Sequence, residues 1–121
     1  VAGDGEFCDR ATGQRFIPRG AIYTRLGPIH TPGGVITYHT TFQVGTYDAG
    51  RAETALRQMA EYANNTVQVE VHGCEDRCVA DPATGRLSGQ YLDNVVDFLR
   101  RAKSHNMFVM LRADDLPHGS S

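Results

Sequence analysis

The sequence predicts an α/β fold in which a β-α-β-α-β unit follows a short N-terminal hairpin. Two observations predict it. Strand-like segments at 19–23, 66–72 and 107–113 alternate with helical segments that begin at Asp48 and Ser88, and each helical segment carries an apolar stripe. Strands that alternate with helices pair in parallel through right-handed crossovers. A (β/α) barrel or an open doubly wound sheet begins in this way, and three strands are too few to close a barrel of eight.

The length and charge of the chain limit its class. With 121 residues it forms one domain at most, which we place at 1–121, and its 40% of apolar residues suffice for a core. A net charge of −2 without a polybasic run predicts no nucleic-acid partner and no basic membrane surface. No stretch approaches the roughly 18 apolar residues of a membrane span. The chain begins at Val1 without a signal-peptide core, so we expect a processed product or a fragment.

The N-terminal segment is predicted to be a hairpin that leads into the first strand. Residues 6–9 and 15–17 flank a stretch in which Asp9, Thr12 and Gly13 favour a turn. The strand then opens at a proline, where a missing N–H is tolerated.

The segment from 26 to 45 is rich in Gly, Pro, Thr and His and shows no helical period. It is longer than an ordinary βα connection of about 2–6 residues. Two interpretations stay open. It is either a binding loop or lid above the sheet, or a surface loop with a hairpin built by residues 35–38.

Both helical segments have recognisable caps and stripes. Asp48 is a favourable N-cap for the first helix and Ser88 for the second. The pair Asn64-Asn65 is expected to end the first helix, because Asn tolerates the left-handed conformation that follows a helix. The apolar stripes are Ala52, Ala55, Leu56, Met59, Ala60 and Ala63 in the first helix, and Leu92, Val95, Val96, Leu99 and Ala102 in the second.

The strand at 66–72 alternates strictly between valine and polar side chains. One face carries Val67, Val69 and Val71, and the other carries Gln68, Glu70 and His72. We expect the valines to pack against the helices. A parallel strand buried on both faces normally reads as a continuous apolar run, so the polar face is predicted to point into a barrel interior or towards a site.

The three cysteines, Cys8, Cys74 and Cys78, leave at least one thiol unpaired in a monomer. Cys74 and Cys78 are a disulfide candidate in a polar loop, and a disulfide favours a secreted or extracytoplasmic source. The alternative is a metal site, because His72 with the two cysteines forms an H-x-C-x3-C cluster of zinc-ligand types. The spacing matches no strong zinc signature, so we expect no metal.

The glycines form neither a G-x-G-x-x-G nor a phosphate-loop pattern, so we expect no nucleotide site and no cofactor.

Several phrases, taken in order, resemble one enzyme clan. Phe7-Cys8-Asp9 with Thr12-Gly13, followed by Phe16-Ile17-Pro18-Arg19-Gly20, is similar to the opening of cellulase-like (clan A type) TIM (β/α)8-barrel glycoside hydrolases. The later phrases that resemble their helices and strands are 38–42 with Tyr47-Asp48, 65–69, 91–99 and 107–117. The resemblance implies the amino-terminal segment of a carbohydrate-active glycoside hydrolase, with a carbohydrate or glycoside ligand, that is inactive until the remainder of the barrel completes it.

The chain departs from the pattern of that clan at two levels. Where the clan has G-x-N-x-V-R entering the second strand, Ala63 stands for the Gly and Gln68 for the Arg. The acid/base and nucleophile carboxylates of the clan lie at the ends of the fourth and seventh strands, beyond this chain. The catalytic residues therefore stay unknown.

In a parallel α/β sheet, ligands bind at the carboxyl ends of the strands. The candidate substrate-binding residues are Tyr23, Arg25, Tyr38, Glu70, His72, Arg112, Asp114 and Asp115, with Tyr23 or Tyr38 stacking on a sugar ring. The alternative is that these residues pair with each other as a polar network. Glu70 with Asp114 or Asp115 is the one carboxylate pair on adjacent strand ends that a glycosidase could use, and Glu70 with Arg112 is the competing ion pair.

A second class of function stays open beside the enzyme. The chain also fits a small non-catalytic α/β module that binds a ligand or assembles through its exposed sheet edges. Either way we expect a homo-oligomer or association with the remainder of a barrel.

Overall fold

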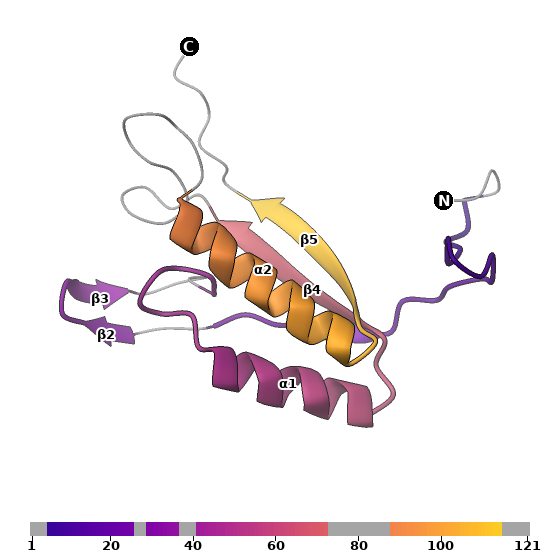
Figure 1. Ribbon diagram of the computed structural model, residues 1–121, viewed down its shortest axis with the longest axis horizontal. Coiled ribbons are helices and arrows are strands. Elements are labelled where there is room, and N and C mark those ends of the chain that lie inside the picture. Colours follow the sequence, from indigo (N-terminus) through magenta and orange to yellow (C-terminus); the bar gives the residue numbers. More distant parts are fainter. Residues whose placement is uncertain (1–4, 26–28, 37–40, 73–87, 115–121) are drawn as a thin grey trace, which may run out of the picture.

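The computed structural model describes residues 5–25, 29–36, 41–72 and 88–114. This part of the chain forms an α/β fold (Figure 1). Its elements are β1 (Gly20–Ile22), β2 (Ile29–Thr31), β3 (Gly34–Ile36), α1 (Ala49–Glu61), β4 (Thr66–His72), α2 (Gly89–Ser104) and β5 (Phe108–Asp114). The predicted alternation of strands and helices is confirmed, although the first strand is shorter than predicted.

Three strands form a parallel sheet in the order β1-β4-β5, which is also their order along the chain. The register places Gly20 beside Thr66 and Thr66 beside Phe108, so the three strands start level with one another. Both helices lie on the same face of this sheet, and α1 packs alongside α2 (Figure 1). Two crossovers of one hand put consecutive helices on one face.

The core lies between the sheet and the two helices. Val67 and Val69 are fully buried there, as the alternation of β4 predicted, because a strand that is covered on one face places every second side chain in the core. The buried apolar set is Phe42, Ala52, Leu56, Val67, Val69, Tyr91, Val95, Phe98, Ala102 and Met107. Phe42 contributes from the segment before α1, and its ring meets Phe98 edge-on at 5.5 Å.

The face of the sheet remote from the helices is only partly covered. Ile22, Phe108 and Met110 lie on this face by register and are each about half exposed. The ring of Phe16 packs against Phe108 with 4.5 Å between centroids. The N-terminal segment therefore covers the end of this face where the strands begin. We call it the open face because Ile22 and Met110 stay about half exposed on it, although Thr66 and Glu70 are buried there.

The N-terminal segment is the predicted hairpin. Cys8 bridges Arg15 in antiparallel fashion, and the N–H of Phe16 donates to the carbonyl of Phe7 at 2.8 Å. Asp9 closes the turn, because its carboxylate accepts from the N–H of Ala11 at 2.8 Å.

The segment from 26 to 45 contains a hairpin at a different place from the predicted one. β2 and β3 pair in antiparallel fashion through a turn at residues 32 and 33. The hairpin predicted at 35–38 begins six residues after the observed one and ends two residues after it. Thr37 and Tyr38 lie outside the described residues. The turn falls at Pro32 and Gly33, which are stronger turn formers than the valine and isoleucine that follow.

The helix ends agree with the predictions only in part. Asp48 is the N-cap of α1 and its carboxylate accepts from the N–H of Arg51 at 2.9 Å. Ser88 is the N-cap of α2, but its side chain makes no capping hydrogen bond. The left-handed residue after α1 is Ala63, with φ of 60°, so the prediction that Asn64-Asn65 takes this conformation was wrong.

Candidate functional site at the strand ends

The parallel register brings the predicted strand-end residues to one end of the sheet. Glu70 lies beside Arg112, and His72 lies beside Asp114, on neighbouring strands. Tyr23 follows β1 at the same end, where its N–H donates to the carbonyl of Gln68 at 2.8 Å. Tyr38, Asp115 and the two candidate disulfide cysteines, Cys74 and Cys78, lie outside the described residues. For His72 and Asp114 the structure fixes the backbone position only.

Glu70 and Arg112 form an ion pair on the open face of the sheet. The Nη1 atom of Arg112 lies 3.3 Å from Oε1 of Glu70. Glu70 is buried, with 9% of its surface exposed, whereas the Arg112 side chain is about half exposed. A buried carboxylate needs a partner, and the cross-strand guanidinium supplies one. The pair thus combines a guanidinium, which only donates hydrogen bonds, with a carboxylate acceptor near the ends of β4 and β5.

Tyr23 is held between the strand end and the helices. Its ring stacks on Phe98 with 5.3 Å between centroids, so one face of the ring is already in contact with the core. Burial raises the pKa of the Tyr23 phenol, and the charges of Asp48 and of two arginines act on it to a smaller extent. The hydroxyl therefore stays protonated at neutral pH and remains a hydrogen-bond donor.

Arg25 ties the end of β1 to the segment that precedes α1. Its backbone N–H donates to Oγ1 of Thr41 at 3.1 Å, and its Nη1 donates to the carbonyl of Thr46. Thr41 and Thr46 are both buried. Arg25 thus anchors the segment that carries Phe42 into the core. The sequence pattern, which made Arg25 a candidate for substrate binding, did not predict this role.

Two further polar groups near this end were not found from the sequence. Oγ1 of Thr24 and Oε1 of Gln43 are buried and have no hydrogen-bond partner within the described residues. Buried polar atoms are normally satisfied. Thr24 follows β1 directly, and Gln43 lies in the segment that Arg25 anchors, so both belong to the strand-end region.

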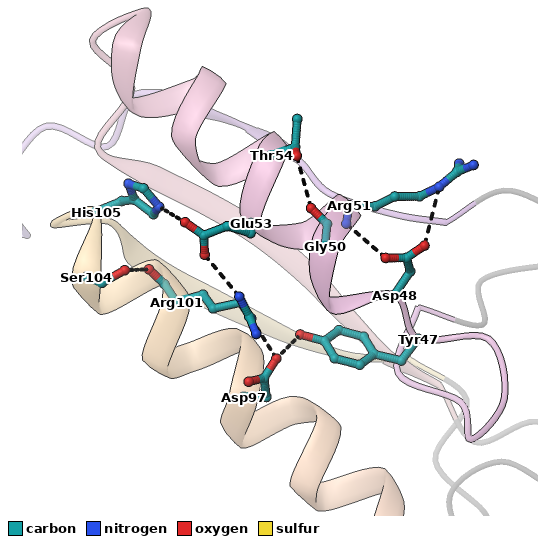
Figure 2. A network of polar contacts seen from close by, with 10 residues as sticks. All are labelled: Tyr47, Asp48, Gly50, Arg51, Glu53, Thr54, Asp97, Arg101, Ser104 and His105. Atoms are coloured by element: carbon teal, nitrogen blue, oxygen red, sulfur yellow. Dashed lines mark hydrogen bonds and ion pairs between the residues drawn. The ribbon is translucent and has the colours of Figure 1, made fainter.

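The helical layer carries a second polar cluster, which we call the helix clamp: Tyr47, Glu53, Asp97, Arg101 and His105 (Figure 2). The Tyr47 hydroxyl donates to Oδ2 of Asp97 at 2.7 Å, and Nε of Arg101 donates to the same oxygen at 2.8 Å. Arg101 also reaches Oε2 of Glu53 at 3.3 Å, and Nε2 of His105 lies 2.6 Å from Oε1 of Glu53. The helix clamp joins α1 to α2 and lies on the helices rather than on the open face of the sheet.

The contacts within the helix clamp shift the pKa values of its two carboxylates and of its tyrosine. The hydrogen bond from His105, followed by that from Arg101, lowers the pKa of Glu53, and the hydrogen bond from Arg101 lowers the pKa of Asp97. Burial and the bond to Asp97 raise the pKa of Tyr47. Only the Asp97–Arg101 pair, at i,i+4 spacing, was detectable in the sequence, because Glu53 and His105 lie 52 positions apart.

The described residues contain no group of three or more His, Cys, Asp or Glu side chains placed to hold a metal ion. The H-x-C-x3-C cluster lies outside this part of the chain except for the backbone of His72. Among the described helices, none has the length and apolar content that crossing a membrane requires.

Comparison with known proteins supports the fold. No protein-family model matches the sequence, and no curated protein matches it. Among solved structures, an exo-β-1,4-mannosidase from Opitutaceae bacterium strain TAV5 superposes with a TM-score of 0.70 at 21% sequence identity. The match covers 93% of this chain and 17% of the mannosidase chain. The chain therefore has the fold of part of a TIM (β/α)8 barrel, and it spans a small part of the length of the enzyme that it resembles.

Proposed function

We propose that the chain is a β-α-β-α-β portion of a glycoside hydrolase barrel and binds a carbohydrate at the carboxyl ends of β1, β4 and β5. The observation that carries the proposal is the Glu70–Arg112 pair, 3.3 Å apart, on the open face of a parallel sheet near its strand ends. Ligands of (β/α) barrels bind at this end. Guanidinium and carboxylate groups are of the types that hydrogen-bond sugar hydroxyls.

The remaining candidate residues lie at the same end of the sheet. Tyr23 supplies a phenol after β1, on the side of the sheet that the helices cover, and His72 and Asp114 occupy neighbouring positions at the ends of β4 and β5. Tyr38 and Asp115 are retained as candidates on sequence grounds. Arg25 supports the site by anchoring the neighbouring segment rather than by contacting the sugar.

A titration with β-1,4-mannobiose, with cellobiose as comparison, tests the binding. We expect chemical-shift changes in a two-dimensional NMR spectrum that are confined to the strand-end residues, with millimolar affinity. Arg112→Met is expected to weaken binding several-fold, whereas Arg57→Met, an equally exposed arginine on α1, leaves it unchanged. Shifts spread over the helices, or the same loss in both variants, would count against the site.

We further propose that the 121-residue chain has no glycosidase activity by itself. Hydrolysis needs two carboxyl groups about 5 to 9.5 Å apart, and in the structure the buried carboxylate of Glu70 is paired with Arg112. Aryl β-glycosides should be stable in its presence. Turnover by the purified chain that Glu70→Gln abolishes would overturn this proposal and make Glu70 a catalytic residue.

An extracytoplasmic source is a further proposal, and it depends on Cys74 and Cys78. Mass spectrometry of the unreduced protein should show these two cysteines linked. Two free thiols with stoichiometric zinc would instead favour the metal interpretation.

A further inference from the structure

The segment that precedes α1, residues 41–47, folds into a compact turn beside the end of β1, and we call it the shelf. The N–H groups of Thr46 and Tyr47 both donate to the carbonyl of Gln43 at 3.0 Å, and Oγ1 of Thr46 donates to the same oxygen at 3.1 Å. Four residues of the shelf are at most 7% exposed: Thr41, Phe42, Gln43 and Thr46. The shelf is therefore a packed part of the molecule rather than an extended loop.

Side chains from two elements hold the shelf. From the end of β1, Arg25 bonds to it through both its backbone N–H and its guanidinium. From α2, Nδ2 of Asn94 donates to the carbonyl of Phe42 at 2.9 Å. Also from α2, Asp97 accepts from the hydroxyl of Tyr47 at 2.7 Å. Asn94 and Asp97 are three residues apart, so they lie on one face of the helix. The shelf is thus fixed between the end of β1 and α2.

The carboxylate of Asp97 is itself fixed in place. Its Oδ2 atom accepts from Tyr47 and, at 2.8 Å, from Nε of Arg101, and Figure 2 shows both donors pointing at it. Arg101 in turn reaches Glu53 of α1 at 3.3 Å. The hydrogen bonds from Arg101 and from Tyr47 lower the pKa of Asp97, so its carboxylate is charged near neutral pH. Hydrogen bonds to a charged group are about twice as strong as neutral ones.

We propose that Asp97 is a positioning residue of the strand-end site, which acts through Tyr47 by holding the shelf against the end of β1. The shelf carries the carbonyl that binds the guanidinium of Arg25. It also carries the ring of Phe42, which packs on the same phenylalanine of α2 as Tyr23 does. Displacement of the shelf would therefore displace the residues that follow β1. The effect on sugar binding, though not the contact itself, rests on the proposed function.

The helix clamp consists of two halves that separate variants can test. One half joins α1 to α2 through the contacts of Glu53 with Arg101 and His105. The other half joins the shelf to α2 through the hydroxyl of Tyr47. Tyr47→Phe removes only this hydroxyl and retains the ring that packs on Phe42, with 5.9 Å between centroids. Glu53→Gln weakens only the first half. If Asp97 merely stabilised the fold, the two variants would act alike on the shelf.

Amide hydrogen exchange followed by NMR measures how firmly the shelf is held. The probes are the N–H groups of residues 46 and 47, compared with those of β4. We expect Tyr47→Phe to speed exchange of the shelf amides about tenfold relative to the β4 amides. Glu53→Gln should change both sets by the same factor. Tyr62→Phe, a control at a tyrosine that is 83% exposed, should change neither. An unchanged ratio in Tyr47→Phe, or the same rise in Glu53→Gln, would overturn the proposal.

Acid gives a second readout. Among the described residues, the charged and titratable groups that face Asp97 are Tyr47, Arg101, Arg100 and, beyond Arg101, Glu53. Because the folded pKa of Asp97 lies below its unfolded value of 3.8, its hold on the shelf is present above that value and is lost as the pH falls through the folded pKa. The exchange ratio should therefore rise in acid in the parent chain and in Glu53→Gln, and stay flat in Tyr47→Phe. A rise in Tyr47→Phe equal to that of the parent would exclude Asp97 as the group responsible.

Titration with β-1,4-mannobiose separates this proposal from the proposed function. We expect Tyr47→Phe to raise the dissociation constant several-fold, and Glu53→Gln to leave it unchanged at a temperature where both variants are folded. Binding that Tyr47→Phe does not weaken, although its shelf amides exchange faster, would overturn the positioning role and leave the proposed function standing. If the parent chain binds no mannobiose, the proposed function fails, and the exchange ratio still decides whether Asp97 holds the shelf.

Discussion

At the scale of single residues, the close contact between β1 and β4 depends on Gly20. A Cβ atom at this position would lie 1.5 Å from the carbonyl oxygen of Thr66 and 2.6 Å from its carbon. These are backbone atoms of the neighbouring strand, so a rotamer change cannot relieve the clash. Asn65 reinforces the contact, because its side chain accepts from the N–H of Arg19 at 2.7 Å and donates to the carbonyl of Ile17 at 3.0 Å.

We therefore expect Gly20→Ala to destabilise the chain by about 2–4 kcal/mol, since the strands must separate to accommodate the methyl group. Urea denaturation followed by circular dichroism measures the change. Gly89→Ala is the control, because nothing lies within 4 Å of its added Cβ in the first turn of α2. There alanine should be neutral or slightly stabilising. A small effect of Gly20→Ala would show that β1 is not packed on β4 as described.

Ala63 is in a strained conformation, although the sequence pattern placed it in the apolar stripe of the first helix, which ends at Glu61. The clan that the sequence resembles has glycine here, and in this structure Ala63 takes a left-handed φ of 60°. A residue with a Cβ pays about 1–2 kcal/mol for this conformation, and glycine does not.

Ala63→Gly should therefore raise the free energy of unfolding by about 0.5–1 kcal/mol after the entropy lost by glycine is subtracted. The thermal midpoint should rise by a few degrees. Ala55→Gly, inside α1, should have the opposite sign because glycine weakens a helix interior. A destabilising Ala63→Gly would mean that the chain leaves α1 differently from the described geometry.

At the scale of elements, periodicity and capping residues predicted the two helices and the central strand. Asp48, Ser88 and the valines of β4 placed both helices and the central strand to within a residue or two of their observed bounds, because these features act within one element. The hairpin within 26–45 was misplaced, although its turn at Pro32 and Gly33 carries a local signal. The helix clamp was missed, because most of its contacts join residues far apart in the chain, which no local pattern contains.

The helix clamp should make stability depend on pH in the acid range. The pKa of Glu53 and that of Asp97 are lowered in the folded chain, so both carboxylates stabilise the fold above their unfolded values of 4.5 and 3.8. This stability is lost as the pH falls through the lower folded values. Thermal melting between pH 7 and pH 3 should therefore show a falling midpoint.

Glu53→Gln should lower the midpoint at pH 7 and flatten its fall towards pH 3, because one of the two titrating groups has been removed. Glu61→Gln is the matched control, since Glu61 lies on the same helix outside the helix clamp, 3.9 Å from Arg57. It should leave the pH profile unchanged. An unaltered profile in Glu53→Gln would show that the contacts of Glu53 with Arg101 and His105 do not form in solution.

At the scale of the whole molecule, the fold class and the order of the strands followed from the alternation of elements. The positions of Glu70 and Arg112 on one face followed from the period of two in β4 and β5. Their ion pair was one of the alternatives that the sequence left open, and it is confirmed. The register between the strands, which the sequence does not state, decides for it by fixing Glu70 opposite Arg112. The same reasoning covers Tyr23, whose place at the strand end was predicted and whose stacking on Phe98 was not.

The sheet has one covered face and one open face. Side-chain truncations on the two faces should therefore lower the free energy of unfolding by different amounts. Val69 is fully buried beneath the helices, whereas Met110 is 46% exposed on the open face. Val69→Ala is expected to cost about 2–3 kcal/mol, from lost burial and the cavity that remains. Met110→Ala should cost less than about 1 kcal/mol, because its side chain is only half removed from water. Denaturant unfolding measures both. Equal costs would show that something covers the open face, and the hairpin of β2 and β3 would be the first element to test by deletion, because it lies outside the core that Phe42 helps to form.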